Sequence, residues 1–225
     1  MTIRTSALAA ILAILSFGTS FAGESVSANA EVLLQKAKNG DADAQWRIAS
    51  MYDTGTGVPR NGKEAMKWYR ASAEQGNAEA QNSLGSALQA ERRYEEALPW
   101  YERAAAQGHA LATNNLAYLY DLGLGVEQDR KKGFELYSVA ANLGWAEAMW
   151  NIANMYGAGQ LGKKDLVQAC IWTVRAARFA TPNEKVLIAR TSNLIPRVEA
   201  NLSKTDAATC REQGSSWSPS ARAPN

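Results

Sequence analysis

Small and apolar side chains recur in four similar segments, each of which opens on a glycine: Gly40, Gly76, Gly108 and Gly144. Alanines stand two and four positions after each glycine, isoleucine or leucine stands eight positions after it, and tyrosine or leucine twelve. Spacings of four place these side chains on one face of an α-helix. Each segment is therefore predicted to begin with an amphipathic helix, which we term the A helix.

A second apolar stripe follows in each segment. It begins at an alanine or glycine, has tryptophan or leucine three positions later, and ends at an alanine eight positions after its start. These separations again define one helical face, so we expect a second helix, the B helix, packed antiparallel to the first. The first positions of the four stripes are Ala65, Ala97, Gly133 and Ala169, and the last are Ala73, Ala105, Ala141 and Ala177.

The four glycines are 36, 32 and 36 residues apart. A period in this range is typical of stacked helical hairpins. The second segment is shorter because it lacks the loop with paired glycines that separates the two helices elsewhere, as at Gly55 and Gly57. The predicted fold class is all-α: an α/α solenoid of about four helix-turn-helix repeats with N- and C-terminal capping helices. The repeats are assigned to 40–75, 76–107, 108–143 and 144–179.

The flanking segments are predicted to cap the solenoid, because terminal repeats must cover an apolar face. Residues 23–39 form the N-terminal cap and residues 180–213 the C-terminal one. Within the latter, residues 183–201 read as a helix that is kinked or broken near Pro196. Ser203 and Asp206 resemble a capping box that opens a last short helix. Residues 214–225 are expected to be a disordered tail.

The repeated pattern resembles the Sel-one-like repeat family, which is related to the tetratricopeptide repeats. It consists of G-x-A-x-A-x-x-x-Leu/Ile-Ala/Gly-x-x-Tyr, then G-x-G-Val, then Ala-x-x-Trp-Tyr, and it covers about residues 40–179. The second copy, with Tyr94-Glu-Glu-Ala97-Leu-Pro-Trp-Tyr, is closer to a tetratricopeptide repeat. The resemblance implies a scaffold that binds a protein or peptide through the concave face lined by its A helices, and no enzyme.

That resemblance also identifies the A-helix positions that should point inward, six, seven and ten residues after each glycine. An amide-rich groove is expected, because asparagine offers both a donor and an acceptor to the backbone of an extended peptide. Its aromatic members would anchor apolar side chains, or else fill gaps between stacked repeats. The candidate partner-binding residues are Trp46, Arg47, Ser50, Asn82, Asn114, Asn115, Tyr118, Trp150, Asn151 and Asn154.

The N-terminus has the features of a secretory signal peptide. A basic residue, Arg4, precedes the apolar run 7–17, and Ser20-Phe-Ala22 forms a small-x-small cleavage site. We expect residues 1–22 to be cleaved after Ala22, giving a periplasmic or secreted protein without a stable membrane anchor; an uncleaved anchor is the alternative. The chain has two cysteines, and export favours a Cys170–Cys210 disulfide over two buried thiols.

Catalytic and nucleic-acid-binding functions find little support in the sequence. The chain has one histidine, His109, which follows a repeat-opening glycine and is read as a surface residue, so no histidine-based metal cluster is expected. The glycine pairs lack the remaining residues of dinucleotide and phosphate loops, and no cofactor is expected. Removal of residues 1–22 would leave 23 basic and 22 acidic side chains, a balance that gives little attraction for nucleic acid.

Two alternatives to an adaptor, a scaffold that binds a protein partner, stay open. A cell-wall-fragment-binding or β-lactam-hydrolysing protein is one, because cysteine-rich members of the wider family are linked to penicillin-type ligands; those members carry cysteine pairs within each repeat, and this chain does not. A structural homo-oligomer is the other, and the sequence does not fix the oligomeric state. Among adaptor roles, envelope assembly, secretion, host interaction and sensor regulation stay open.

Overall fold

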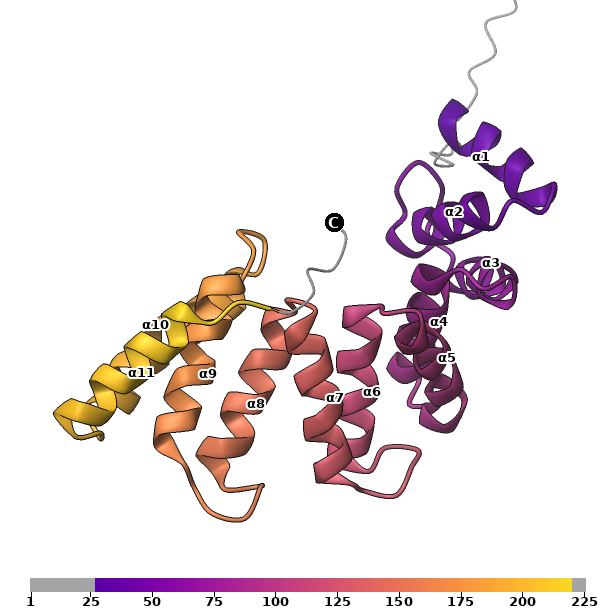
Figure 1. The fold of residues 1–225 in the computed structure, drawn as a ribbon. Coiled ribbons are helices and arrows are strands. Elements are labelled where there is room, and N and C mark those ends of the chain that lie inside the picture. The colour runs from indigo at the N-terminus through magenta and orange to yellow at the C-terminus, as the bar shows by residue number, and fades with distance from the viewer. Residues whose placement is uncertain (1–26, 220–225) are drawn as a thin grey trace, which may run out of the picture.

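The computed structural model describes residues 27–219, which form eleven α-helices and no strand. The helices follow one another along a curved row from the N-terminal to the C-terminal end (Figure 1). Their bounds are α1 Ala28–Lys38, α2 Ala42–Thr54, α3 Gly62–Glu74, α4 Ala78–Ala90, α5 Tyr94–Ala106, α6 Ala110–Leu122, α7 Arg130–Asn142, α8 Ala146–Ala158, α9 Leu166–Phe179, α10 Lys185–Glu199 and α11 Lys204–Ser216.

Four antiparallel hairpins make up the central part of the row: α2 with α3, α4 with α5, α6 with α7, and α8 with α9. The A helices are therefore α2, α4, α6 and α8, and the B helices are α3, α5, α7 and α9. Each hairpin also packs against the next one, which confirms the predicted all-α solenoid of helix-turn-helix repeats. None of the helices between residues 27 and 219 combines the length and apolar character that a bilayer crossing requires.

The repeat-opening glycines occupy the turn from one hairpin to the next. Gly40, Gly76, Gly108 and Gly144 have φ between 80° and 93°, a left-handed conformation that side chains with a Cβ rarely adopt. The next residue caps the A helix in three repeats: the side chains of Asp41, Asn77 and His109 accept hydrogen bonds from backbone N–H groups three residues on. His109, predicted to be a surface residue, is thus a half-buried helix cap, and its imidazole accepts a backbone hydrogen bond that the sequence analysis did not foresee.

Alanines, leucines and isoleucines of the A helices pack against the B helices. In each of the first three hairpins, the B helix contributes a tyrosine ring to this core. Tyr69, Tyr101 and Tyr137 are all buried, four positions after the start of their B-helix stripes. Opposite Tyr101 the A helix carries Gly85, where a Cβ would come within 2.7 Å of the ring. The other repeats have alanine at this position, so the glycine is a local adjustment to the tyrosine ring.

The C-terminal helices α10 and α11 both pack on α9. Helix α10 continues through Pro196 to Glu199, so of the kink or break expected near this proline the break does not occur. Pro196 lies in the last turn, where its missing N–H costs one hydrogen bond, and its carbonyl accepts from the Ala200 N–H at 3.0 Å. Ser203 caps α11 by accepting from the Asp206 N–H at 3.1 Å, which is the N-cap bond of the predicted capping box; the Asp206 carboxylate accepts in turn from the Ser203 hydroxyl at 2.8 Å.

The predicted disordered tail was wrong for its first part. Helix α11 continues to Ser216, and the indole of Trp217 packs edge-on against Trp172 and Phe179 of α9. The Arg178 guanidinium donates to the carbonyls of Ser215 and Trp217 and so ties this segment to α9. The expected signal peptide and residues 220–225 lie outside the described residues.

Candidate functional site

The A helices share one face of the solenoid, and side chains six and seven positions after the repeat glycines meet there. In each case a residue at position six of one repeat is hydrogen-bonded to the residue at position seven of the next. Asn115 Nδ2 donates to Asn82 Oδ1 and Asn151 Nδ2 donates to Asn114 Oδ1, both at 3.1 Å. Trp46 Nε1 donates to Ser83 Oγ at 3.4 Å in the equivalent place. We call these three bonds the A-helix ladder.

The ladder changes the interpretation of the predicted asparagines. Asn82 and Asn114 are buried, with exposed fractions of 8% and 7%, and their carbonyl oxygens are engaged by Asn115 and Asn151. The sequence predicted that these amides would be offered to the backbone of a bound peptide, but a buried amide that is paired across two helices fits the interior of a stack. They hold neighbouring repeats together and form the floor of the A-helix face.

The predicted aromatic anchors divide in the same way. Trp46 and Trp150 are half-buried; Trp46 packs against the hydrophobic cluster that runs through the first three repeats, and Trp150 against the cluster of the third and fourth. Tyr118, by contrast, is 39% exposed, and Leu122, one turn further along α6, is 44% exposed. Of the aromatic anchors expected from the sequence, Tyr118 is therefore the most exposed.

The remaining predicted residues lie at the edges of the same face. Asn154 and Arg47 are exposed and Ser50 is half-buried. Arg47 Nε forms an ion pair with the Asp43 carboxylate at 2.7 Å, one helical turn away. The structure therefore brings all ten predicted residues to the A-helix face, but only some of them can reach a partner without breaking internal bonds.

A second set of buried amides was missed by the sequence reasoning. Gln45 and Gln81, five positions after their glycines, donate to the Ala37 and Ala73 carbonyls at 3.0 and 3.1 Å. Their own carbonyl oxygens accept from Gln75 and Gln107 at 2.7 and 2.8 Å. The recurrence of glutamine at two offsets in the first two repeats could have revealed this network.

Charge is unevenly distributed between the two helix types. The A helices contain five carboxylates and a single basic side chain, which is already paired. Burial raises the pKa of the Asp121 and Glu147 carboxyls, while Arg130 and Arg190 respectively act in the opposite direction. The six charged residues are Asp43, Arg47, Asp53, Glu79, Asp121 and Glu147.

Two hollows are lined by A-helix residues, one near each end of the row of repeats. The first lies between α2 and α4, has a volume of about 290 Å³ and is lined mainly by polar side chains, among them Asp53, Tyr69 and Ser86. The second lies between α8, α9 and α10 and has a volume of about 390 Å³. Its lining is mostly apolar: Ala153, Asn154, Gly157, Ala158, Leu166, Ala169, Thr173, Leu194 and Val198.

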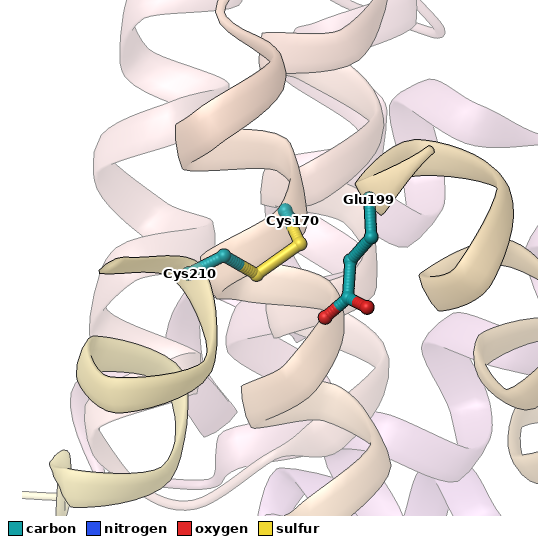
Figure 2. A group of neighbouring side chains, drawn as sticks. All are labelled: Cys170, Glu199 and Cys210. Carbon is teal, nitrogen blue, oxygen red and sulfur yellow. A yellow bond between two sulfur atoms is a disulfide. The ribbon is translucent and has the colours of Figure 1, made fainter. Parts of the chain in front are cut away.

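Cys170 and Cys210 form a disulfide that joins α9 to α11, with the Glu199 side chain beside it (Figure 2). Their ligand atoms lie within 4.8 Å of one another, which is compatible with metal binding by distance alone. The sulfurs are bonded to each other, however, and so offer no thiolate, and the Glu199 carboxylate pairs with Arg211 at 2.9 Å. This cluster therefore stabilises the cap.

The hairpin order, the glycine turns and the shared A-helix face define an α/α repeat protein of the solenoid class. Four copies of the Sel1 repeat profile match residues 42–77, 78–109, 110–145 and 146–178, and the chain belongs to the Sel1 repeat family. These four stretches coincide with the four hairpins.

Solved structures agree with this assignment. The chain superposes with a TM-score of 0.75 on c5321, a protective antigen of uropathogenic Escherichia coli with an SLR fold; the two are 28% identical over 83% of this chain and 40% of that one. A Sel1 repeat protein from Oxalobacter formigenes is 33% identical, with a TM-score of 0.62, over 68% of this chain and 65% of that one.

Relatives with assigned roles come from rhizobia. An exopolysaccharide production negative regulator of Rhizobium meliloti (strain 1021) is 29% identical over 63% of this chain and 46% of its own length. The protein of the same name from Rhizobium leguminosarum bv. viciae is 28% identical over 65% and 48%. The chain thus spans about half the length of these relatives.

Proposed function

We propose that this protein is an exported scaffold that binds a protein or peptide partner on its A-helix face. The observation that carries the proposal is that this face combines internally hydrogen-bonded side chains with exposed ones. The A-helix ladder holds the floor in one arrangement, and a row of side chains that take no part in it remains accessible. Tyr118, Leu122 and Asn154 are its exposed members. A preorganised floor with an exposed aromatic anchor reduces the entropic cost of binding.

The charges of the A helices indicate the chemistry of the partner. Four of the five carboxylates belong to the first three repeats, where Asp43 is paired with Arg47 and Asp121 lies 3.9 Å from Arg130 of α7. The remaining negative charge of Asp53 and Glu79 favours a partner that presents lysine or arginine to these repeats, through complementary potentials. The chain as a whole carries a formal charge of +2, so this preference belongs to the A-helix face and not to the molecule in general.

A disulfide between buried cysteines supports an oxidising compartment, as expected for the periplasm or the exterior of the cell. Among the adaptor roles, the names of the rhizobial relatives favour a regulatory one, in which the scaffold controls another envelope protein. We infer that catalysis is not part of this role.

The proposal can be tested by photo-crosslinking in the native host. A benzophenone amino acid at Tyr118, on the A-helix face, should crosslink a discrete partner, whereas the same residue at Val139, an exposed position of α7, should not. The purified partner should then bind the wild-type protein at least about tenfold more tightly than a Tyr118→Ala/Asn154→Ala variant, because both side chains would lie in the interface.

A Val139→Ala variant is the matched control and should bind the partner like the wild type. Equal crosslinking from both positions, or unchanged affinity of the double variant, would contradict binding on the A-helix face. A purified protein that sediments as a stable dimer through this face would instead support the homo-oligomer.

A further inference from the structure

The B helices place a tyrosine at the same position in three of the four repeats. Tyr69, Tyr101 and Tyr137 have exposed fractions of 5%, 0% and 1%, and their rings pack beneath the A helices. In the second repeat the Tyr101 hydroxyl lies 3.2 Å from Ser86 Oγ and 3.0 Å from Gln89 Oε1 on the facing A helix. Each of these rings fills the space between an A helix and its own B helix.

The fourth repeat has no such ring. Its equivalent B-helix residue is Thr173, which is fully buried and donates its hydroxyl to the Ala169 carbonyl at 2.7 Å. The facing A helix is reduced as well: Gly157 stands where the other repeats carry Asp53, Gln89 and Asp121. The fourth repeat thus has smaller side chains at two facing positions, Thr173 of α9 and Gly157 of α8, than the other repeats have.

The apolar hollow between α8, α9 and α10 lies at this place. Thr173 and Gly157 both line it, just as Tyr69 and Asp53 line the smaller polar hollow of the first repeat. Leu194 and Val198 of α10 close its far side, and Leu166, which is 38% exposed, lies at its edge. The hollow belongs to the A-helix face, because Ala153, Asn154 and Ala158 of α8 form one of its walls.

We propose that this hollow receives a tyrosine side chain of the bound partner, which takes the place of the ring that the fourth repeat lacks. This inference rests on the proposed function and names the partner's anchor residue. The phenol would lie against Leu166, Leu194 and Val198, and its hydroxyl would meet Asn154, the counterpart of the Ser86 that contacts the Tyr101 hydroxyl. An amide can both donate to and accept from a phenol.

Tyrosine suits this site better than an aliphatic residue for two reasons. A planar tyrosine ring occupies the space between the A helix and the B helix in each of the three other repeats. A phenol also presents an apolar body to an apolar wall and a polar tip to the exposed asparagine, at a low cost in side-chain entropy.

The test uses the full-length exported protein and four acetylated nonapeptides. The central residue is tyrosine, phenylalanine, leucine or alanine, and serines and lysines flank it. Binding is followed by methyl chemical shifts, with Leu166, Leu194 and Val198 reporting the hollow. We expect the tyrosine peptide to bind at least about tenfold more tightly than the alanine peptide and to shift these methyl signals. The phenylalanine peptide should be intermediate.

A Thr173→Tyr variant restores the missing ring and should abolish the preference for tyrosine over alanine. Because that change is made at a buried position, Gly157→Leu serves as a second filling variant; a Cβ at Gly157 has ordinary contact with Ala169, at 3.6 Å. Thr205→Tyr, at an exposed position of α11, is the matched control and should leave the preference intact. Thermal unfolding establishes that each variant is folded.

Two outcomes would overturn the tyrosine site. One is that the four peptides bind equally or not at all; the other is that a folded filling variant keeps the preference for tyrosine. In either case, a partner that still crosslinks from Tyr118 would leave the proposed scaffold function intact. Conversely, a tyrosine preference without any Tyr118 crosslink would place binding in the hollow alone and would count against the wider A-helix face.

Discussion

The four A helices have chemically different N-cap residues, although each N-cap follows the same glycine turn. Asp41, Asn77 and His109 each accept a hydrogen bond from the backbone, while Trp145 makes no such bond. In His109 the acceptor is Nδ1, at 3.1 Å from the Ala112 N, so the cap requires an imidazole without a proton on that nitrogen. Burial lowers the pKa of this histidine, and nearby Glu79 acts in the opposite direction.

This cap gives the stability of the fold a specific pH dependence. A folded-state pKa below the ordinary value of 6.5 means that the unfolded chain binds the proton first as the pH falls. The stabilising contribution of His109 is therefore fully present and independent of pH above about pH 6.5, and it is lost as the pH falls from there toward the lower folded-state value. We expect urea unfolding at pH 7.5 and 5.5 to show a smaller loss for His109→Asn than for the wild type.

The alanine variant separates the cap from the charge. His109→Ala should cost about 1 kcal/mol at pH 7.5, where the asparagine variant keeps the cap and should cost little. A wild-type protein and an asparagine variant that respond identically to pH would show that His109 does not contribute to the pH dependence.

At the scale of elements, the C-terminal cap depends on contacts that join distant parts of the sequence. Helices α10 and α11 are polar over much of their surface and contribute few fully buried side chains. The Cys170–Cys210 bond, the Ser203 cap and the Trp217 contacts hold them to α9. Much of their stability should accordingly come from the cross-link.

Removal of the disulfide should therefore destabilise the protein measurably. The bridge closes a 40-residue segment, and in the chain-entropy model its loss from a Cys170→Ala/Cys210→Ala variant costs about 4 kcal/mol. The free energy of urea unfolding measures this change, and the wild type in a strong reductant should lose a similar amount. A variant as stable as the oxidised wild type would mean that packing alone holds the cap.

The element scale also shows what the sequence could reveal. The hairpins were predictable because glycine turns, caps and stripes of period 3.6 are local features that recur four times. The path of the C-terminal tail was not predictable from the sequence. Trp217 contacts Trp172 and Phe179, which are about 40 residues away in the chain, and no local spacing indicates such a contact. The apolar hollow could not be predicted for a related reason. One of its walls is formed by α10, which lies outside the repeats, so the repeat pattern does not give its position.

For the whole molecule, order along the solenoid depends on interfaces between neighbours only. The sequence proposed ten candidate residues on the A helices, yet it could not distinguish those accessible to a partner from those bonded to the next repeat. Asn114 and Asn115 are adjacent in the chain, but Asn114 bonds forward to α8 and Asn115 bonds back to α4. This distinction follows from the offset between stacked helices.

The ladder should therefore couple adjacent repeats and leave more distant ones independent. In a double-mutant cycle, Asn82→Ala and Asn115→Ala should show a coupling of about 0.5–1.5 kcal/mol in the free energy of unfolding, because either change alone removes the same hydrogen bond. Asn82→Ala and Asn151→Ala form the matched control. They belong to different rungs on α4 and α8, and their effects should add. Coupling of equal size in both cycles would mean that the asparagines act through a general loosening of the stack, and no coupling in the first would mean that the bond contributes nothing to the register of the repeats.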